Sequence, residues 1–170
     1  MFSVNMTPTC FGKTQTLMNR ILIFLSLAIL LISCNQKTTV FNQHKELPSK
    51  GWHKDSVAHF EVSLEKKTVY NFLINLRNRN DYKSQNMWLF VSYERPDKTI
   101  KNDTLNFYLA DNQGRWLGSG FGSLHQMQVV FIPNIEFSQA GVYKFDIKHG
   151  MRDTTLIGIN DIGLEILKNN

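Results

Sequence analysis

The sequence predicts an all-β protein whose body is an antiparallel β-sandwich, jelly-roll or immunoglobulin-like, of about seven or eight strands. Apolar and polar residues alternate with a period of two along several short segments, which is typical of strands that bury one face. Clusters of Asn, Asp, Gly and Pro separate these segments and predict tight turns. The amino terminus differs, because an apolar run there ends at a cysteine, and this pattern predicts export.

Residues 18–33 are predicted to be a lipoprotein signal peptide. Arg20 precedes an apolar run from Ile21 to Ile32, which at about 12 residues is too short to span a bilayer. The run ends in Leu-Ile-Ser-Cys, which resembles the bacterial lipobox. Signal peptidase II is therefore expected to cleave between Ser33 and Cys34, and Cys34 is expected to carry the lipid that anchors the mature chain to a membrane.

The segments on either side of this signal are assigned from their composition. Residues 1–17 resemble neither a signal nor a domain, so they are predicted to be a spurious upstream extension, with translation beginning at Met18. Residues 34–50 contain the lipidated cysteine and a polar stretch without a sustained period, which predicts a tether. Residues 51–170 are assigned to the β-sandwich domain, and their length suits a single hydrophobic core.

Seven segments of the predicted domain alternate clearly enough to be assigned as strands. In order along the chain they cover residues 59–64, 70–77, 86–93, 104–109, 126–132, 142–147 and 159–167. A glycine-rich stretch at residues 118–122 superficially resembles a phosphate-binding loop. It lacks the lysine and the helix that such a loop requires, so a hairpin or bulge is the better interpretation.

Composition excludes several classes of protein. The two cysteines, Cys10 and Cys34, both precede the predicted domain, so the domain holds no disulfide, thiolate metal site or cysteine nucleophile. The formal charge of the whole chain is +5. Lys13 and Arg20 lie before the predicted cleavage point, so the mature chain would keep 17 basic and 14 acidic residues and a formal charge of +3. Because no run of five basic residues occurs, no nucleic-acid partner is expected.

No motif in the sequence requires an enzyme. The five histidines are scattered and form no short-spaced pair that would favour a zinc site, and there is no nucleophile elbow, phosphate-binding loop or dinucleotide fingerprint. We therefore expect no catalytic residues, no metal and no cofactor.

Two turn clusters are the candidate sites for partner binding. The first contains Arg77, Arg79 and Tyr82, and the second contains Arg115 and Trp116. Arginine beside an aromatic ring in a turn is typical of protein contact hot spots and of platforms that stack on sugars. The alternative is that Tyr82 and Trp116 begin strands and pack inward while the arginines are solvated.

The ordered set of motifs resembles one family, the gliding-motility lipoprotein GldH of Bacteroidetes. The resemblance begins with the lipobox, covers nearly the whole predicted mature chain, and rests on the order and spacing of the motifs together. The motifs are Trp52, the Phe60 strand, Tyr70 to Phe72, Leu76 to Asn78 with Tyr82, Asn86 to Phe90, Asp103 to Leu105, Leu109 to Asp111, Gly114 to Gly118, Gly141 to Phe145, His149 to Arg152 and Gly158 to Leu164.

The resemblance implies a non-enzymatic envelope lipoprotein required for gliding motility, a component or assembly factor of the gliding and type IX secretion machinery. Its partners would be the membrane, through the lipid anchor, and other Gld or envelope proteins. Asn35 after the lipidated cysteine permits sorting to the outer membrane, and the absence of an acidic run favours the periplasmic face. The alternative is a carbohydrate-binding envelope lipoprotein that uses the aromatic turns.

Overall fold

The computed structural model describes residues 37–169, and this part of the chain is built from β-strands joined by turns. The strands are β1 (Thr38–Glu46), β2 (Trp52–His53), β3 (Ala58–Leu64), β4 (Val69–Arg79), β5 (Asn86–Glu94), β6 (Ile100–Tyr108), β7 (Ser119–Phe121), β8 (Leu124–Glu136), β9 (Gly141–His149), β10 (Thr155–Leu156) and β11 (Ile159–Lys168). Eight of them contain seven residues or more.

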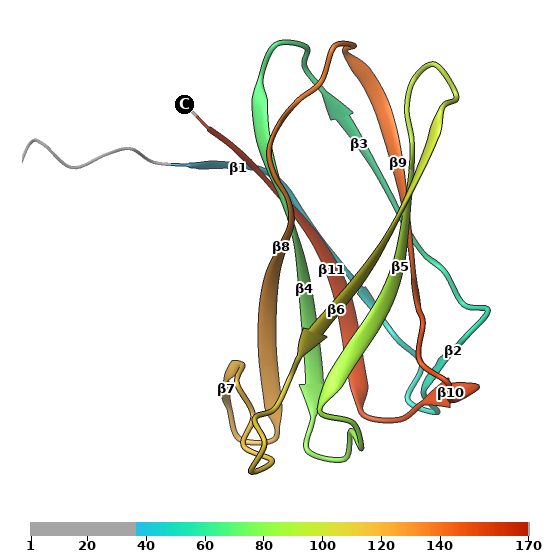
Figure 1. Cartoon of the computed structure of the whole chain (residues 1–170), viewed down its shortest axis with the longest axis vertical. Helices are drawn as coiled ribbons and strands as arrows, with labels where there is room; N and C mark the ends of the chain where they lie inside the picture. Colours follow the sequence, from blue (N-terminus) through green and yellow to red (C-terminus); the bar gives the residue numbers. More distant parts are fainter. Residues whose placement is uncertain (1–36, 170) are drawn as a thin grey trace, which may run out of the picture. The chain divides into compact units, whose positions relative to one another are not determined.

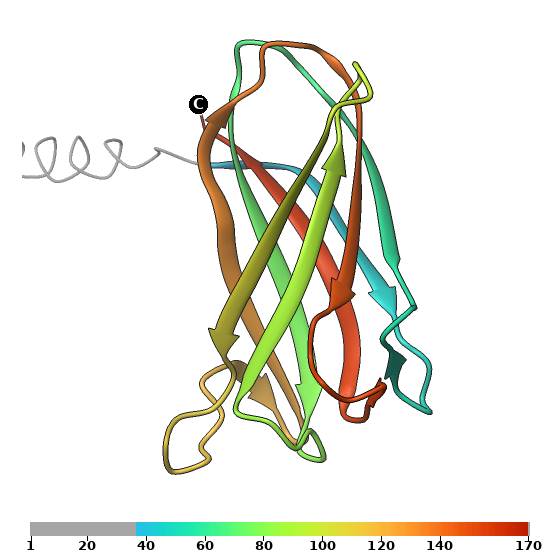
Figure 2. The same ribbon diagram turned by 45° about the vertical axis from the view of Figure 1, so that its right-hand side comes forward.

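Two antiparallel sheets lie face to face and form a sandwich (Figures 1 and 2). One sheet has the strand order β1-β11-β4-β8-β7, and the other has the order β3-β9-β5-β6. The short strands β10 and β2 pair with each other at one end. The prediction of an all-β antiparallel sandwich is confirmed.

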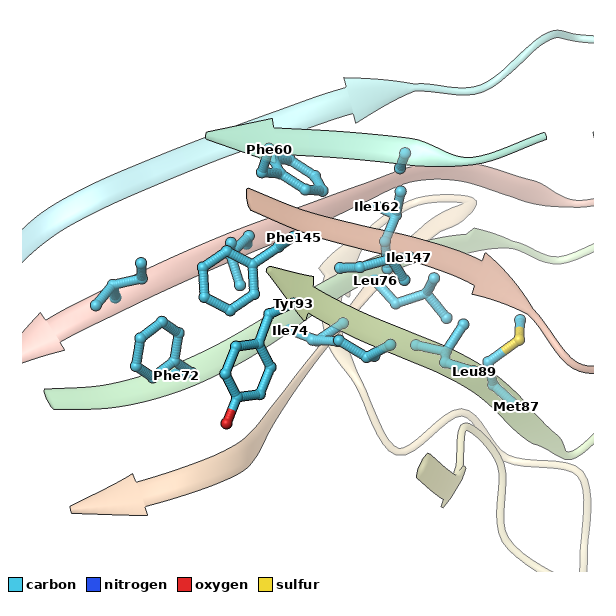
Figure 3. Packing of buried hydrophobic residues seen from close by; sticks show 14 of the residues in the cluster. Phe60, Phe72, Ile74, Leu76, Met87, Leu89, Tyr93, Phe145, Ile147 and Ile162 are labelled. Carbon is cyan, nitrogen blue, oxygen red and sulfur yellow. The ribbon is translucent and has the colours of Figure 1, made fainter. Parts of the chain in front are cut away.

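The core fills the space between the sheets, where the buried apolar residues of the long strands meet. Along β3 the residues are alternately buried and exposed, so that Phe60 points inward while His59 and Glu61 point outward. Figure 3 shows rings from three strands meeting in this core, with 5.2 Å between the ring centroids of Phe72 and Phe145 and 5.6 Å between those of Tyr93 and Phe145. Each such ring stabilises the fold by about 2 kcal/mol through its burial.

Strand β1 corrects the predicted tether of residues 34–50. Thr38–Glu46 pairs along its length with β11 and forms an edge of the five-stranded sheet. The sequence pattern missed this strand because it is an edge strand with few apolar residues. Phe41 packs against the core, whereas Lys45 keeps its ammonium 5.9 Å from the centroid of the Phe60 ring.

Strand β1 begins at one end of the five-stranded sheet, and the β7–β8 hairpin lies at the other end. Thr38, where β1 begins, is in register with Lys168, and Lys168 is in register with Tyr70 near the start of β4. The β7–β8 hairpin lies at the other end, because Leu124 is in register with Arg79 (Figure 1). From Tyr70 to Arg79 the strand extends about 30 Å at 3.3 Å per residue.

Candidate functional site

An exposed aromatic stripe crosses the outer face of the four-stranded sheet. Trp88 and Phe90 alternate along β5 with buried Met87 and Leu89, so that both rings point away from the core. Their exposed fractions are 41% and 43%, and Tyr108, on the same face of β6, is 60% exposed. No strand of the described residues lies over this face in Figure 2. The stripe is the largest group of exposed rings that the pairing register brings together.

A hollow of about 510 Å³ continues from the stripe along β5. Two rows of paired residues form its floor: Phe90 lies between Lys148 and Thr104, and Ser92 lies between Asp146 and Asn102. Lys148 Nζ is 5.9 Å from the centroid of the Phe90 ring, close enough for a cation–π attraction. The face thus changes from aromatic at Trp88 to polar at Ser92.

A buried ion cluster stabilises the five-stranded sheet on its outer side. Asp161 is fully buried, and its carboxylate accepts hydrogen bonds from Arg77 Nε at 2.8 and 2.7 Å and from Asn160 Nδ2 at 2.8 Å. The Nδ1 atom of His44 is 2.9 Å from Asp161 Oδ1. Burial would raise the pKa of Asp161, but Arg77, Asn160 and His44 together hold it below its ordinary value.

The predicted site residue Arg77 is therefore a structural ion-pair partner, and Tyr82 is not a surface residue. Tyr82 is only 5% exposed, donates a hydrogen bond to the carbonyl oxygen of Asn86 at 2.9 Å, and has its pKa raised to about 12 by burial. The Tyr82 ring packs in the core, which is the alternative that the sequence left open for this residue. Arg79 bonds to Asp81 at the surface, and this bond lowers the pKa of Asp81.

The second predicted cluster forms a self-contained turn. Asp111 Oδ2 accepts a hydrogen bond from Arg115 Nε at 2.7 Å, and Asp111 Oδ1 accepts one from the Arg115 backbone nitrogen at 2.9 Å. These bonds lower the pKa of Asp111. Trp116 stacks on His125 with 5.5 Å between ring centroids. Both residues thus have partners within the molecule: Arg115 bonds to Asp111, and Trp116 stacks on His125.

The glycine-rich stretch forms a hairpin that displays one ring to solvent. Phe121 ends β7 and is in register with Leu124, so only two residues close the turn, and Gly122 supplies the positive φ of 69° that such a turn requires. The Phe121 side chain is 97% exposed. In the same register Leu124 lies between Phe121 and Arg79, which places Arg79 and Phe121 on one face.

The aromatic stripe was not predicted from the sequence, although a signal for it was present. Within the predicted strand of residues 86–93 the alternation is broken, because residues 87–91 are all apolar, whereas a strand with one solvated face should alternate throughout. The sequence shows that both faces of this strand are apolar, but it does not show whether another element covers the second face. Only the arrangement of the sheets decides that.

Within residues 37–169, no group of three His, Cys, Asp or Glu side chains is arranged to hold a metal ion. The same residues contain no helix long and apolar enough to cross a membrane. The predicted cleavage site at Ser33 and the predicted lipidation site at Cys34 lie outside the described residues, as do residues 1–17 and the signal peptide of residues 18–33.

The fold and its surfaces define a class of protein: an antiparallel β-sandwich that displays exposed aromatic rings. The family model described as GldH lipoprotein matches residues 39–166. The chain therefore belongs to the GldH lipoprotein family, a family of envelope lipoproteins associated with gliding motility, as the resemblance indicated.

Two relatives agree with this assignment. The gliding motility lipoprotein GldH homolog of Christiangramia forsetii is 33% identical over 158 residues, which cover 88% of this chain and 96% of the relative. The gliding motility lipoprotein GldH of Flavobacterium johnsoniae is 36% identical over 152 residues, covering 85% of this chain and 93% of the relative.

Solved structures give only distant likenesses. The VP2 subviral particle of infectious bursal disease virus aligns with 78% of this chain and 31% of its own, at 14% identity and a TM-score of 0.34. The fructofuranosidase of Schwanniomyces occidentalis aligns with 82% of this chain and 35% of its own, at 8% identity and a TM-score of 0.35. Likenesses at this level carry no argument about function.

Proposed function

We propose that the chain is a non-catalytic component or assembly factor of the gliding and type IX secretion machinery that acts by binding other envelope proteins. The observation that carries the proposal is the family match over residues 39–166, together with relatives named for gliding motility. A sandwich with displayed rings and no metal-binding cluster among its described residues suits a binding role.

We further propose that lipid on Cys34 attaches the protein to the outer membrane, with the domain on the periplasmic side. Only three residues lie between Cys34 and Thr38, so the four steps from one to the other span at most about 14 Å. Since Thr38 already belongs to β1, the end of the sheet where β1 begins would lie against the membrane. The β7–β8 hairpin lies about 30 Å further along the sheet and would face away from it.

Phe121 at this distal hairpin is the proposed contact for a protein partner. The short hairpin fixes the backbone that carries the exposed Phe121 ring, so little backbone entropy would be lost when a partner covers it. Arg79 lies on the same face, and the combination of an aromatic ring with arginine is common in protein interfaces.

Genetic complementation tests this proposal. Deleting the gene should abolish spreading on agar, and the native gene should restore it. Phe121→Ser should leave the protein level and the membrane fraction unchanged while it reduces spreading. Val130→Ser is the matched control, because Val130 is an exposed apolar residue elsewhere on β8. A deletion strain that spreads normally would refute the motility role.

Lipidation and processing have a separate test. Labelling with radioactive palmitate should mark the native protein, and Cys34→Ala should lose both the label and the membrane association. Mass spectrometry of the precursor examines the start site, since translation from Met18 produces no peptide that contains Cys10. Detection of a Cys10 peptide would contradict the proposed start.

A further inference from the structure

We propose that the outer face of the four-stranded sheet binds a linear glycan, with Trp88, Phe90 and Tyr108 as its stacking platform. This site is separate from the Phe121 hairpin, and the proposal does not depend on a role in motility. It also differs from the turn residues of the sequence-based carbohydrate hypothesis, since Tyr82 is buried and Trp116 stacks on His125.

The three exposed rings lie in a row that an extended polymer could follow. Trp88 and Phe90 are two residues apart on β5, which places their attachment points about 7 Å apart along the strand. Tyr108 lies diagonally across from Trp88, because Trp88 is in register with Asn106. The faces of aromatic rings are electron-rich and apolar, which suits the C–H faces of sugar rings. Ladder hydrogen bonds on both sides of β5 keep the row rigid.

The hollow beyond Phe90 supplies the polar contacts that a sugar requires. The hydroxyls of Ser92 and Thr104 can donate or accept, the amide of Asn102 can do both, and Lys148 can donate. Among the described residues Lys148 has no ion-pair partner and the Asn102 side chain has no hydrogen-bond partner, so both remain available to a ligand. A pocket with an aromatic floor and a few convergent polar groups is typical of small-molecule and sugar sites.

Charge favours a hydroxyl-rich glycan over other occupants. Asp103 and Asp146 carry negative charge at the hollow and Lys148 carries positive charge, so neither an anionic membrane surface nor a strongly charged polymer is favoured. The centre of a protein interface is depleted of charged residues, whereas here the charges adjoin the central ring, Phe90. Carboxylates and an ammonium close together suit hydroxyl groups, which donate to the former and accept from the latter.

Co-sedimentation of the mature lipoprotein, purified in detergent, tests the proposal. One arm uses isolated peptidoglycan sacculi and the other uses cellulose, so the arms distinguish an amino-sugar glycan from a neutral one. We expect saturable binding in at least one arm. Trp88→Ala and Phe90→Ala should each weaken the apparent affinity by about tenfold or more. Val130→Ala, which truncates an exposed apolar residue on the other sheet, should bind as the native protein does.

Asn102→Ala is a second binding variant, for the case that the ring variants do not fold. It removes an exposed amide from β6 and leaves every ring in place, so it should fold normally and weaken binding several-fold. The thermal midpoint of each variant reports folding. The proposal is overturned if neither polymer binds, or if the folded ring variants and Asn102→Ala bind as tightly as the native protein. A photo-crosslinker at position 108 that captures protein while both glycan arms are negative also overturns it.

Discussion

Single buried polar residues of this sandwich affect its stability through partners that are distant in the chain. Asp161 is buried, and its negative charge is stabilised by a hydrogen-bonded ion pair with Arg77. The two residues are 84 positions apart in the chain. Removing one partner of such a pair leaves the other charge desolvated and alone, which is far more destabilising than losing a pair at the surface.

Arg77→Met should therefore lower the free energy of unfolding by about 3 kcal/mol, the lower end for a broken buried pair because water reaches part of the Arg77 side chain. Arg79→Met is the matched control. It lies two residues along the same strand and pairs with exposed Asp81, so it should cost less than about 1 kcal/mol. Urea unfolding measures both variants. Equal losses would contradict a special role for the Asp161 pair.

His149 should make the fold sensitive to mild acid. Burial lowers the pKa of this ring below its ordinary value of 6.5, although the backbone of Trp52 acts in the opposite direction. The folded state favours the neutral ring, so below pH 6.5 the unfolded chain binds more protons than the folded one. Stability contributed by this group is present above that pH and is lost as the pH falls toward the lower pKa of the folded state.

His149→Phe should flatten the decline of the unfolding free energy between about pH 7 and pH 5, by up to about 1.4 kcal/mol per pH unit. Phenylalanine keeps a flat ring against Trp52, whose centroid lies 5.3 Å from that of His149. His59→Gln, which changes an exposed histidine on β3, is the control and should keep the decline that His149 causes. Asp161 loses its charge only in stronger acid, so its contribution does not confuse the comparison.

At the scale of elements, strand β1 depends on one close approach to β11. Gly163 faces His44 across the pair, and a Cβ atom on Gly163 would lie 2.8 Å from the His44 ring, well inside contact distance. The absence of a side chain at Gly163 therefore lets His44 lie flat over the strand and reach Asp161.

Gly163→Ala should cost about 1 to 3 kcal/mol, because the added methyl group displaces the His44 ring. His44→Ala alone loses the contact with Asp161. The double variant should be less destabilised than the sum of the two single variants, by about 1 kcal/mol, since the methyl group then has room. Chemical denaturation of the four proteins completes the cycle, and strictly additive losses would contradict the proposed clash.

The elements differ in how far their sequence predicted them. Strands β3, β4, β5, β9 and β11 each place several apolar residues in the core, so their alternation was visible and their positions were predicted to within a few residues. The first half of β6, Ile100 to Asp103, is exposed, and β1 is mostly polar. Edge strands pair through the backbone, which any residue except proline can do, so their side chains carry little signal.

At the scale of the whole molecule, the lipid proposed on Cys34 would place the start of β1 near the membrane. With lipid on Cys34, the β3–β4 loop would lie near the bilayer, because Lys168 beside the start of β1 bonds to Glu65 in that loop. The hairpin turn at Ser123 lies at the opposite end of the sheet.

Depth measurements should detect this orientation. A fluorophore attached through Lys66→Cys should be quenched strongly by lipids that carry a headgroup nitroxide, whereas one attached through Ser123→Cys, about 30 Å further along the sheet, should not. Both sites are exposed, so labelling should not disturb the core. Equal quenching at the two positions, in the lipidated protein on vesicles, would contradict the proposed arrangement.

The sequence by itself determined the all-β class, the positions of the core strands, the absence of cysteine from residues 35–170 and the family. Only the tertiary structure decided that β1 belongs to the sheet and that Tyr82 is buried. It also decided that Arg77 forms an ion pair with Asp161, and that the rings of Trp88, Phe90 and Tyr108 share an open face. The physical reason is range. Alternation records which residues share a side of one strand, but exposure and ion pairing depend on strands that are distant in the chain and meet only when the sheets assemble.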